Sequence, residues 1–307
     1  MMNISKTIFP LSALTILMLL TCCNREQVMS DVELKSFSET VKAEDIKQHI
    51  AVLADDSLKG RLPGTTEYDK AMAYVVEKYK ALGLKPKGNQ EGTSFYQELS
   101  IRTTLVNENE SYLIMNNSDT LTAGQDYFFL GNADQEIAEL KGELVFAGYG
   151  IEAPEYGFDD FKDIEVKNKV VLVILGTPDI FPASERAYFG NLATKIQTLD
   201  KKGASAIFFM LSPEVKAGIE RIHSRFSKNG FSTVIMPSGK ASGMMALGDN
   251  LKIGGFMNWA SVEDLFDNAD EAWANYRDQK NGPMHISKTT ELSGKVSSSF
   301  KEIESAN

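Results

Sequence analysis

Four carboxylates within seven residues form a potential metal-binding group: Asp159, Asp160, Asp163 and Glu165. Calcium sites in proteins are built from several oxygen ligands, so a calcium loop is one interpretation of this segment. The ordered spacing of an EF-hand loop is absent. We therefore expect a solvated acidic loop here, with a calcium loop as the alternative.

The three histidines are further candidates, because imidazole is a common zinc ligand. They occur as His49-Ile-Ala, His223-Ser-Arg and His285-Ile-Ser, and the H-E-x-x-H motif of zinc peptidases is absent. His49 lies on the apolar face of an expected helix, where we interpret it as a hydrogen-bonded core residue rather than a ligand. The residues alone predict no metal ligands in this chain.

Nucleophilic chemistry has no recognisable motif either. A G-x-S-x-G elbow is absent, and the two cysteines, Cys22 and Cys23, lie in an expected leader, which removes a Cys–His mechanism. A phosphate-binding loop needs glycines between a strand and a following helix, and that order does not occur. The sequence does not show that a Ser, a His and an Asp meet. We predict no catalytic residues and no cofactor-binding residues.

The N-terminus has the pattern of an export signal. Lys6 precedes the apolar run Leu11–Leu20, which is too short to span a bilayer stably and is followed by two cysteines. The pattern resembles a bacterial lipoprotein signal with Cys23 as the acylated residue, and Cys22 fits less well. The alternative is a secreted protein that loses both cysteines with its leader. We expect a signal peptide at 1–23, a tether at 24–40, a disulfide-free exported chain and attachment to the cell envelope through lipid.

Composition is that of a globular protein. Hydrophobic residues make up 43% and charged residues 24% of the 307 residues, which is ordinary for a chain that buries a core. The net charge is −10. Nucleic acid is therefore not an expected partner, because clustered basic side chains are what bind phosphates.

Two helices are predicted near the start of the exported chain. The first, over 43–54, carries Ile46, His49, Ile50 and Leu53 at helical spacing. The second, over 66–82, is expected to begin with a capping box at Thr66 and to end at Gly83. Its expected apolar stripe consists of Met72, Val75, Val76 and Tyr79.

Short apolar runs separated by turns predict a β-rich region after residue 94. Two of them, Glu143–Ala147 and Lys169–Leu175, have the composition of strands covered on both faces. A helix ending at Gly203 and one running from Ser261 to near Gly282 are also expected; the aromatic stripe of the latter is interpreted as core, with ligand contact as the alternative. The other predicted strands are Phe95–Ile101, Tyr112–Met115, Tyr127–Leu130, Ala206–Leu211, Val234–Pro237, Leu251–Trp259 and Glu291–Ser305.

Four segments resemble a known family. VFAGYGIEAPEYGFDDF, followed by KNKVVLVILGTPD, is similar to the protease-associated domain inserted in bacterial di-zinc aminopeptidases, family twenty-eight of the metallopeptidases. GASAIFFM resembles the same domain, and HIAVLADDSLKGRLPGTTEYDKAMAYVVEKYKALGLKP is similar to the opening segment of these enzymes. The resemblance places Arg61 near the active-site side of the catalytic domain, where it orients a loop; a salt-bridged structural arginine is the alternative.

The resemblance implies an α/β (α+β) fold and a zinc peptidase, but only part of one. In the family, an Asn like Asn307 begins a strand that leads into the catalytic domain, and all zinc ligands lie after it. The family's first ligand pair is His-x-Asp, which none of the three histidines here matches. Zinc is thus expected in the full-length family and not in this chain. The implied parts are a helical segment at 41–94, a protease-associated domain at 95–290 and a strand at 291–307.

Three hypotheses remain open at this stage. The first is a catalytically incompetent N-terminal and protease-associated portion of an aminopeptidase-like lipoprotein, with its two helical stripes left uncovered. The second is a lipid-anchored accessory module that binds a peptide or protein partner. The third is a split enzyme whose catalytic half is a separate chain that docks on the two stripes.

Overall fold

A computed structural model describes residues 36, 40–88, 92–211, 218–270, 273–274, 286 and 288–306. The chain divides into two compact units, Met1–Leu62 and Pro63–Asn307. The elements form a mixed α/β structure with one large sheet, which confirms the predicted fold class. The boundary expected between 94 and 95 stays a prediction. Cys23, Asn307, His285 and the tether apart from Ser36 and Thr40 lie outside the described residues.

The first unit contains the predicted helix near the N-terminus, α3 (Ala43–Leu53). Glu44 and Asp45 lie in its first turn, where negative charge interacts favourably with the helix dipole. Not one of its residues is buried, and Ile46 and Ile50 are 48% and 58% exposed. The prediction that His49 is a core residue is therefore wrong, because His49 is exposed with the rest of this face.

The second unit begins with α4 (Thr66–Ala81), close to the predicted range. Its N-cap is Thr65 rather than Thr66: the Thr65 side chain accepts a hydrogen bond from the Tyr68 backbone N–H at 3.3 Å. Gly83 adopts φ 70°, the left-handed conformation expected after the helix. Only Ala71 and Val76 are buried, and Tyr79 is 44% exposed. The predicted stripe is thus partly covered.

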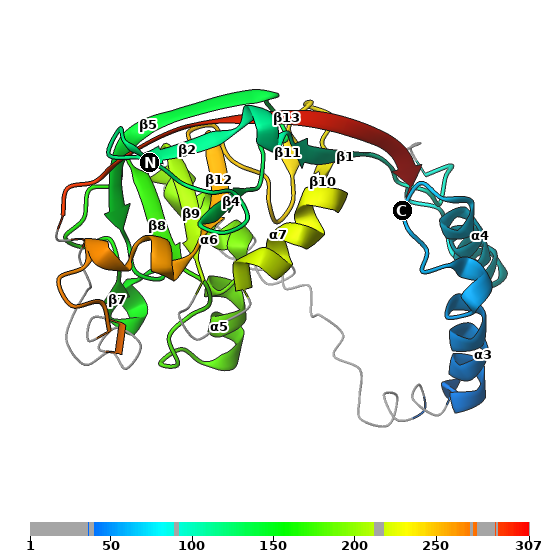
Figure 1. Cartoon of the computed structure of the whole chain (residues 1–307). Helices are drawn as coiled ribbons and strands as arrows, with labels where there is room; N and C mark the ends of the chain where they lie inside the picture. Colours follow the sequence, from blue (N-terminus) through cyan, green and yellow to red (C-terminus); the bar gives the residue numbers. More distant parts are fainter. Residues whose placement is uncertain are drawn as a thin grey trace, which may run out of the picture. The chain divides into compact units, whose positions relative to one another are not determined.

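Eleven strands form the large sheet, in the order β11-β10-β1-β13-β5-β8-β9-β12-β4, with β2 also paired to β13 and β3 paired to β2. Figure 1 shows the strands in place. Their bounds are β1 Glu98–Val106, β2 Tyr112–Met115, β3 Asp119–Thr120, β4 Tyr127–Phe129, β5 Ile137–Phe146, β8 Val170–Ile174, β9 Ala206–Met210, β10 Phe231–Ile235, β11 Ala241–Ser242, β12 Ile253–Met257 and β13 Glu291–Ala306.

Parallel pairing joins β5, β8, β9 and β12, whereas β1, β2, β4, β10 and β13 pair antiparallel with their neighbours. Every residue of β8, β9 and β12 is buried, as expected for parallel strands covered on both faces. For Glu143–Ala147 the prediction of cover on both faces is wrong at Glu143, which is exposed. It holds from Leu144 onward, because Leu144 and Phe146 lie in one core, Ala147 lies in the other, and half-buried Val145 packs against that other core.

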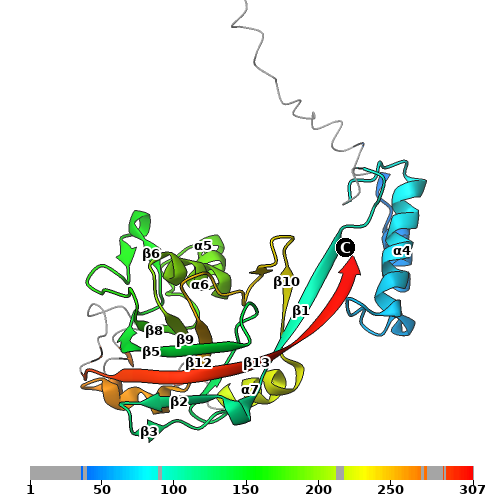
Figure 2. The same ribbon diagram turned by 90° about the horizontal axis from the view of Figure 1, so that it is seen from above.

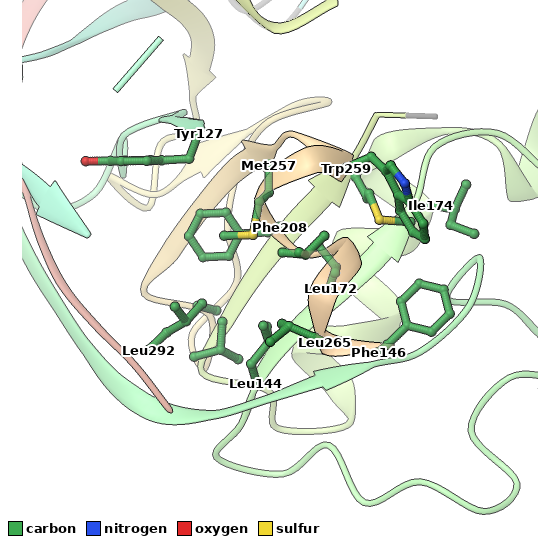
Figure 3. Packing of buried hydrophobic residues seen from close by; sticks show 14 of the residues in the cluster. Tyr127, Leu144, Phe146, Leu172, Ile174, Phe208, Met257, Trp259, Leu265 and Leu292 are labelled. Atoms are coloured by element: carbon green, nitrogen blue, oxygen red, sulfur yellow. The ribbon is translucent and has the colours of Figure 1, made fainter. Parts of the chain in front are cut away.

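The two faces of the parallel strands build two separate cores. Leu172, Phe208 and Met257 lie on one face, together with Trp259 and Leu265 (Figure 3). Their sequence neighbours point the other way; Val171, Val173, Ile207, Phe209 and Phe256 belong to the second core. This alternation follows from the two-residue period of side chains along a strand.

Helices cover the second core. α6 (Leu192–Lys201) contributes Ile196 and Leu199 and ends before Gly203, as predicted. α7 (Gly218–Asn229) contributes Ile219. α7 was not predicted from the sequence, nor was α5 (Ala183–Phe189).

The first core is closed by two short 3-10 helices, Trp259–Ser261 and Glu263–Leu265, in place of the beginning of the helix expected from Ser261. Trp259 and Phe266 stack with their ring centroids 5.4 Å apart. Leu265, Phe266 and Trp273 are all buried in the first core. The core interpretation of this aromatic stripe is thereby confirmed for its described members, and Tyr276 lies outside the described residues.

The last strand, β13, has 16 residues and matches the predicted range closely. It pairs with β5 and β2 along its first part and with β1 along its second part, as Figure 2 shows from above. The strand predicted at Val234–Pro237 is β10, which begins earlier, at Phe231, and stops before Pro237. Proline lacks the N–H that a strand ladder needs.

Candidate functional site

The acidic segment that suggested calcium binding uses three of its four carboxylates to hold nearby backbone N–H groups, all but Asp163. Asp159 accepts from the Phe161 N–H at 2.9 Å, Asp160 from the Ile151 N–H at 3.0 Å and Glu165 from the Lys167 N–H at 2.9 Å. Within the described part of the chain, no group of three or more His, Cys, Asp or Glu residues is placed to hold a metal ion. Asp160 is only 8% exposed, so the expectation of a fully solvated loop is wrong at this residue.

The turn-rich segment before it folds as a small hairpin of β6 (Glu152–Ala153) and β7 (Phe158–Asp159). A 3-10 turn at Pro154–Tyr156 connects the strands, and Gly157 closes it at φ 68°. The outer end of the hairpin is fixed to α5, because the Tyr156 hydroxyl donates a hydrogen bond to Glu185 Oε1 at 3.1 Å. This hydrogen bond is the main reason that the pKa of Tyr156 is raised.

The base of the hairpin rests on a buried lysine of α6. Lys195 is 1% exposed. Its Nζ donates a hydrogen bond to the Tyr149 carbonyl oxygen, directly before the hairpin. Burial lowers the pKa of Lys195 to about 8, and the nearby Asp160 carboxylate opposes that shift. A buried charge is costly unless it is paired, so Lys195 and Asp160 together fix where the hairpin leaves the sheet.

Sequence reasoning missed Lys195, although a signal was present. Leu192, Lys195, Ile196 and Leu199 stand at positions i, i+3, i+4 and i+7, which is the spacing of one helix face. A charged residue within such a stripe predicts either a buried, paired charge or a break in the stripe. In the structure Lys195 is buried and paired.

A pocket of about 190 Å³ lies between the hairpin and the two helices α5 and α6. We call it the hairpin pocket. The hairpin side supplies two glutamates, Glu152 and Glu155, and the helix side supplies an aromatic pair and two threonine hydroxyls. The lining residues are Gly150, Ile151, Glu152, Glu155, Tyr188, Phe189, Thr194 and Thr198.

A second polar cluster lies where α7 meets β4. His223 Nε2 and Glu108 Oε1 are 2.6 Å apart, and the side chains are 20% and 41% exposed. Burial, followed by the Glu108 charge, raises the pKa of neighbouring Tyr127 to about 12. The cavity that these residues line measures only about 20 Å³, which is room for about one water molecule. The His223 ring also lies against Gly124, where an added Cβ would be 2.6 Å from Nδ1.

The remaining predicted residues lie in the first unit. His49 and Arg61 line a shallow hollow on α3 together with Ile46, Ile50, Leu53 and Ala54. Arg61 adopts φ 56°, a left-handed conformation that is uncommon for a residue with a side chain. Its predicted role in orienting a loop stays a prediction.

Among the residues that the structure describes, none of the helices has the length and apolar content needed to cross a bilayer.

Comparison with known proteins gives matches among solved structures only: no family model matches the sequence, and no curated protein does. An aminopeptidase from Aneurinibacillus sp. strain AM-1 matches with 15% identity and a TM-score of 0.39, over 86% of this chain and 46% of that chain. BSAP, a zinc aminopeptidase from Bacillus subtilis, matches with 14% identity and a TM-score of 0.33, over 86% and 45%. This chain thus spans less than half the length of either structure.

The described residues do not fit a di-zinc centre. Such a centre needs several His, Asp and Glu side chains around the metals, with a carboxylate bridging them. His223 has a single carboxylate partner, Glu108, and His49 belongs to the other unit. Zinc chemistry is therefore not assigned to these residues.

Proposed function

We propose that this chain is the N-terminal and protease-associated part of a zinc aminopeptidase-like peptidase, and that its own task is to bind peptide rather than to cleave it. The segments that carry the family resemblance support this proposal. VFAGYG contains Val145 and Phe146 of β5, KNKVVLVIL contains β8, and GASAIFFM contains β9. The three strands are neighbours in parallel register, so these three segments lie side by side in one sheet.

The observation that carries the proposal is the composition of the hairpin pocket. It is an open concavity between the resembling segment and the helices α5 and α6, and its polar groups are carboxylates and hydroxyls. General-base catalysis of hydrolysis would need a base within hydrogen-bond reach of a nucleophile. The His223–Glu108 pair lies instead beside a cavity of about 20 Å³, far smaller than a peptide requires. The described sites therefore suit recognition better than hydrolysis.

The test is an assay of the purified chain with a panel of aminoacyl and peptide substrates, together with its zinc content by elemental analysis. We expect no cleavage and less than one tightly held zinc per chain. Cleavage of an N-terminal residue that a chelator abolishes would overturn the proposal, as would stoichiometric zinc that survives dialysis.

The alternative function is a lipid-anchored accessory module. As part of a peptidase the chain would bind peptide for that enzyme, whereas as an accessory module it would bind a separate peptide or protein partner. The hairpin pocket favours it too, because the pocket is complete within the second unit. The proposed anchor is Cys23 and the proposed location is the cell envelope. Metabolic labelling with a radioactive fatty acid tests the anchor: we expect label on the wild-type chain and its loss in Cys23→Ala, whereas loss in Cys22→Ala alone would move the assignment.

A further inference from the structure

One glutamate of the hairpin pocket is neutralised and the other is not. Glu152 Oε2 lies 2.9 Å from Lys202 Nζ, so its charge is balanced by an ion pair. Glu155 is exposed, and among the described residues it has neither an ion-pair nor a hydrogen-bond partner. The mouth of the pocket therefore carries one uncompensated negative charge. A single free carboxylate supplies too few ligands for Ca²⁺ or Mg²⁺, which take six or more oxygens, or for the four-coordinate Zn²⁺.

An aromatic ring faces solvent at the same mouth. Tyr188 is 62% exposed, and its ring forms a T-shaped pair with that of Phe189, with the centroids 5.1 Å apart. Both residues line the pocket with Glu155. A carboxylate beside an accessible aromatic face attracts an organic cation in two ways, through its charge and through the ring quadrupole. The same ring offers apolar surface to the methylene stem that carries such a cation.

The size of the pocket limits the ligand further. Sites for drug-sized molecules measure about 300–1,000 Å³, whereas this one has about 190 Å³. The space suits one long side chain better than a whole small molecule. The hydroxyls of Thr194 and Thr198 come from α6; the Thr198 hydroxyl already donates to the Thr194 carbonyl oxygen. Both hydroxyls can still accept a hydrogen bond from a ligand, because a hydroxyl that donates keeps its lone pairs.

The walls are held in place before any ligand arrives. The Lys195 ammonium fixes the hairpin base at the Tyr149 carbonyl, and the Tyr156–Glu185 hydrogen bond fixes its outer end. The ring of Phe181 packs against both Tyr156 and Phe158, at centroid distances of 5.3 and 5.5 Å. A preformed wall lowers the entropic cost of binding.

We propose that the hairpin pocket binds a lysine or arginine side chain of a peptide. Glu155 pairs with the cationic group, and Tyr188 packs against the methylene stem. This inference rests on the proposed function of peptide binding, and it adds that the pocket selects a peptide with a lysine or arginine residue.

The experiment compares short peptides, blocked at both ends and identical except for one central residue, by fluorescence anisotropy with the purified chain. Lysine and arginine peptides are expected to bind about tenfold more tightly than the norleucine peptide, which keeps the stem and lacks the charge. The glutamate peptide is expected to bind more weakly than the norleucine peptide. This preference should shrink as salt is raised, because Glu155 is exposed.

Glu155→Gln should remove most of the tenfold preference for the lysine peptide over the norleucine peptide. Tyr188→Leu should weaken binding of the lysine peptide by about threefold. Glu165→Gln is the matched control, since it changes the net charge equally on the same segment but lies outside the pocket; its preference should stay as in the wild type. Equal binding of lysine and norleucine peptides would overturn this inference and leave peptide binding intact. A chain that binds none of the peptides would overturn the proposed function and this inference together.

Discussion

The strand β8 and the helix α3 are both rich in aliphatic residues, yet the fold treats them in opposite ways. All five residues of β8 are buried, with exposed fractions of 2% or less. In α3, by contrast, no residue is buried, and Val41 just before it is 61% exposed. The strand has partners on both sides, β5 and β9, and a core on each face. The helix has only a shallow open hollow, lined by Ile46, His49, Ile50, Leu53, Ala54 and Arg61.

The difference teaches where the stability of this chain resides. Complete burial of a Val, Leu or Ile side chain stabilises the folded state by about 1.5–3 kcal/mol. All five residues of β8 are of these types and are buried. An isolated helix of 11 residues is marginal in water. The strand is thus stabilised by the tertiary structure, while the helix depends on local terms such as Glu44 and Asp45 in its first turn.

The largest expected effect on stability comes from a substitution in the strand β8. Leu172→Ala should lower the free energy of unfolding by about 2–5 kcal/mol, because it leaves a cavity in a closely packed core. Urea denaturation followed by circular dichroism measures it. Ile50→Ala, the same kind of truncation on α3, should cost less than about 1 kcal/mol. Equal costs at the two positions would contradict the contrast between strand and helix.

The next effect concerns Lys195, the charged residue in the otherwise apolar buried face of α6. Its pKa is about 8 in the folded chain and 10.5 as an ordinary value, so between these pH values the unfolded chain binds more protons. Stability should therefore rise with pH in this window, by about 2 kcal/mol between pH 7 and 9.5. Lys195→Met should lack this rise, and urea titrations at both pH values compare the two proteins.

The comparison should stop below pH 10, because Tyr127 acts in the opposite direction there. Its folded pKa is raised to about 12, so stability is lost as the unfolded tyrosine ionises above pH 10. Parallel curves for wild type and Lys195→Met between pH 7 and 9.5 would show that Lys195 is not buried as described.

A smaller effect on stability is expected on the exposed face of α3. Replacing Ile46 and Ile50 with glutamine should change the free energy of unfolding by less than about 1 kcal/mol, because glutamine forms helix as well as isoleucine does. Self-association and binding of a hydrophobic dye should both fall, since an exposed apolar face is lost. Sedimentation velocity and dye fluorescence measure these quantities. A loss of 2 kcal/mol or more would mean that another surface covers this face.

The smallest effect is expected at the surface ion pair of the same helix. Lys47 Nζ lies 3.7 Å from Glu44 Oε2, and the two side chains are 72% and 71% exposed. Pairs of this kind contribute about 0–0.5 kcal/mol. Lys47→Ala should therefore leave the urea midpoint nearly unchanged, and a clear shift would show that α3 contributes more to stability than its exposure suggests.

The elements with a strong repeating pattern were the ones that the sequence predicted well. The helix α6, the strands β8 and β9 and the long strand β13 match their expected ranges closely. Where the sequence pattern was weak, the predicted helix starts were wrong, because packing against neighbouring residues decided the local structure. Thr65 rather than Thr66 caps α4, and the segment after Ser261 begins as short 3-10 helices packed under the aromatic cluster around Trp259.

The candidate site was harder to predict from the sequence than the fold was. Its residues come from three places, the hairpin with Glu155, the end of α5 with Tyr188, and α6 with Thr194. Glu155 lies in the segment that carries the family resemblance, but nothing in that segment marked it as a binding residue; Tyr188 belongs to no motif, and α5 was not expected at all. Spacing along a chain carries no information on such convergence, because it depends on how the hairpin folds back over the helices.

By itself, the sequence determined the strands that are apolar at every position and the scarcity of histidines, because both depend on residue type and local periodicity. The tertiary structure alone decided which charges are satisfied. Asp160 and Lys195 are buried near each other and hold the hairpin base, whereas Glu155 projects at a pocket mouth with no ion-pair or hydrogen-bond partner in the described part of the chain. The reason is physical: the energy of a charge depends on its burial and on the groups within a few ångströms, and the folded arrangement sets both.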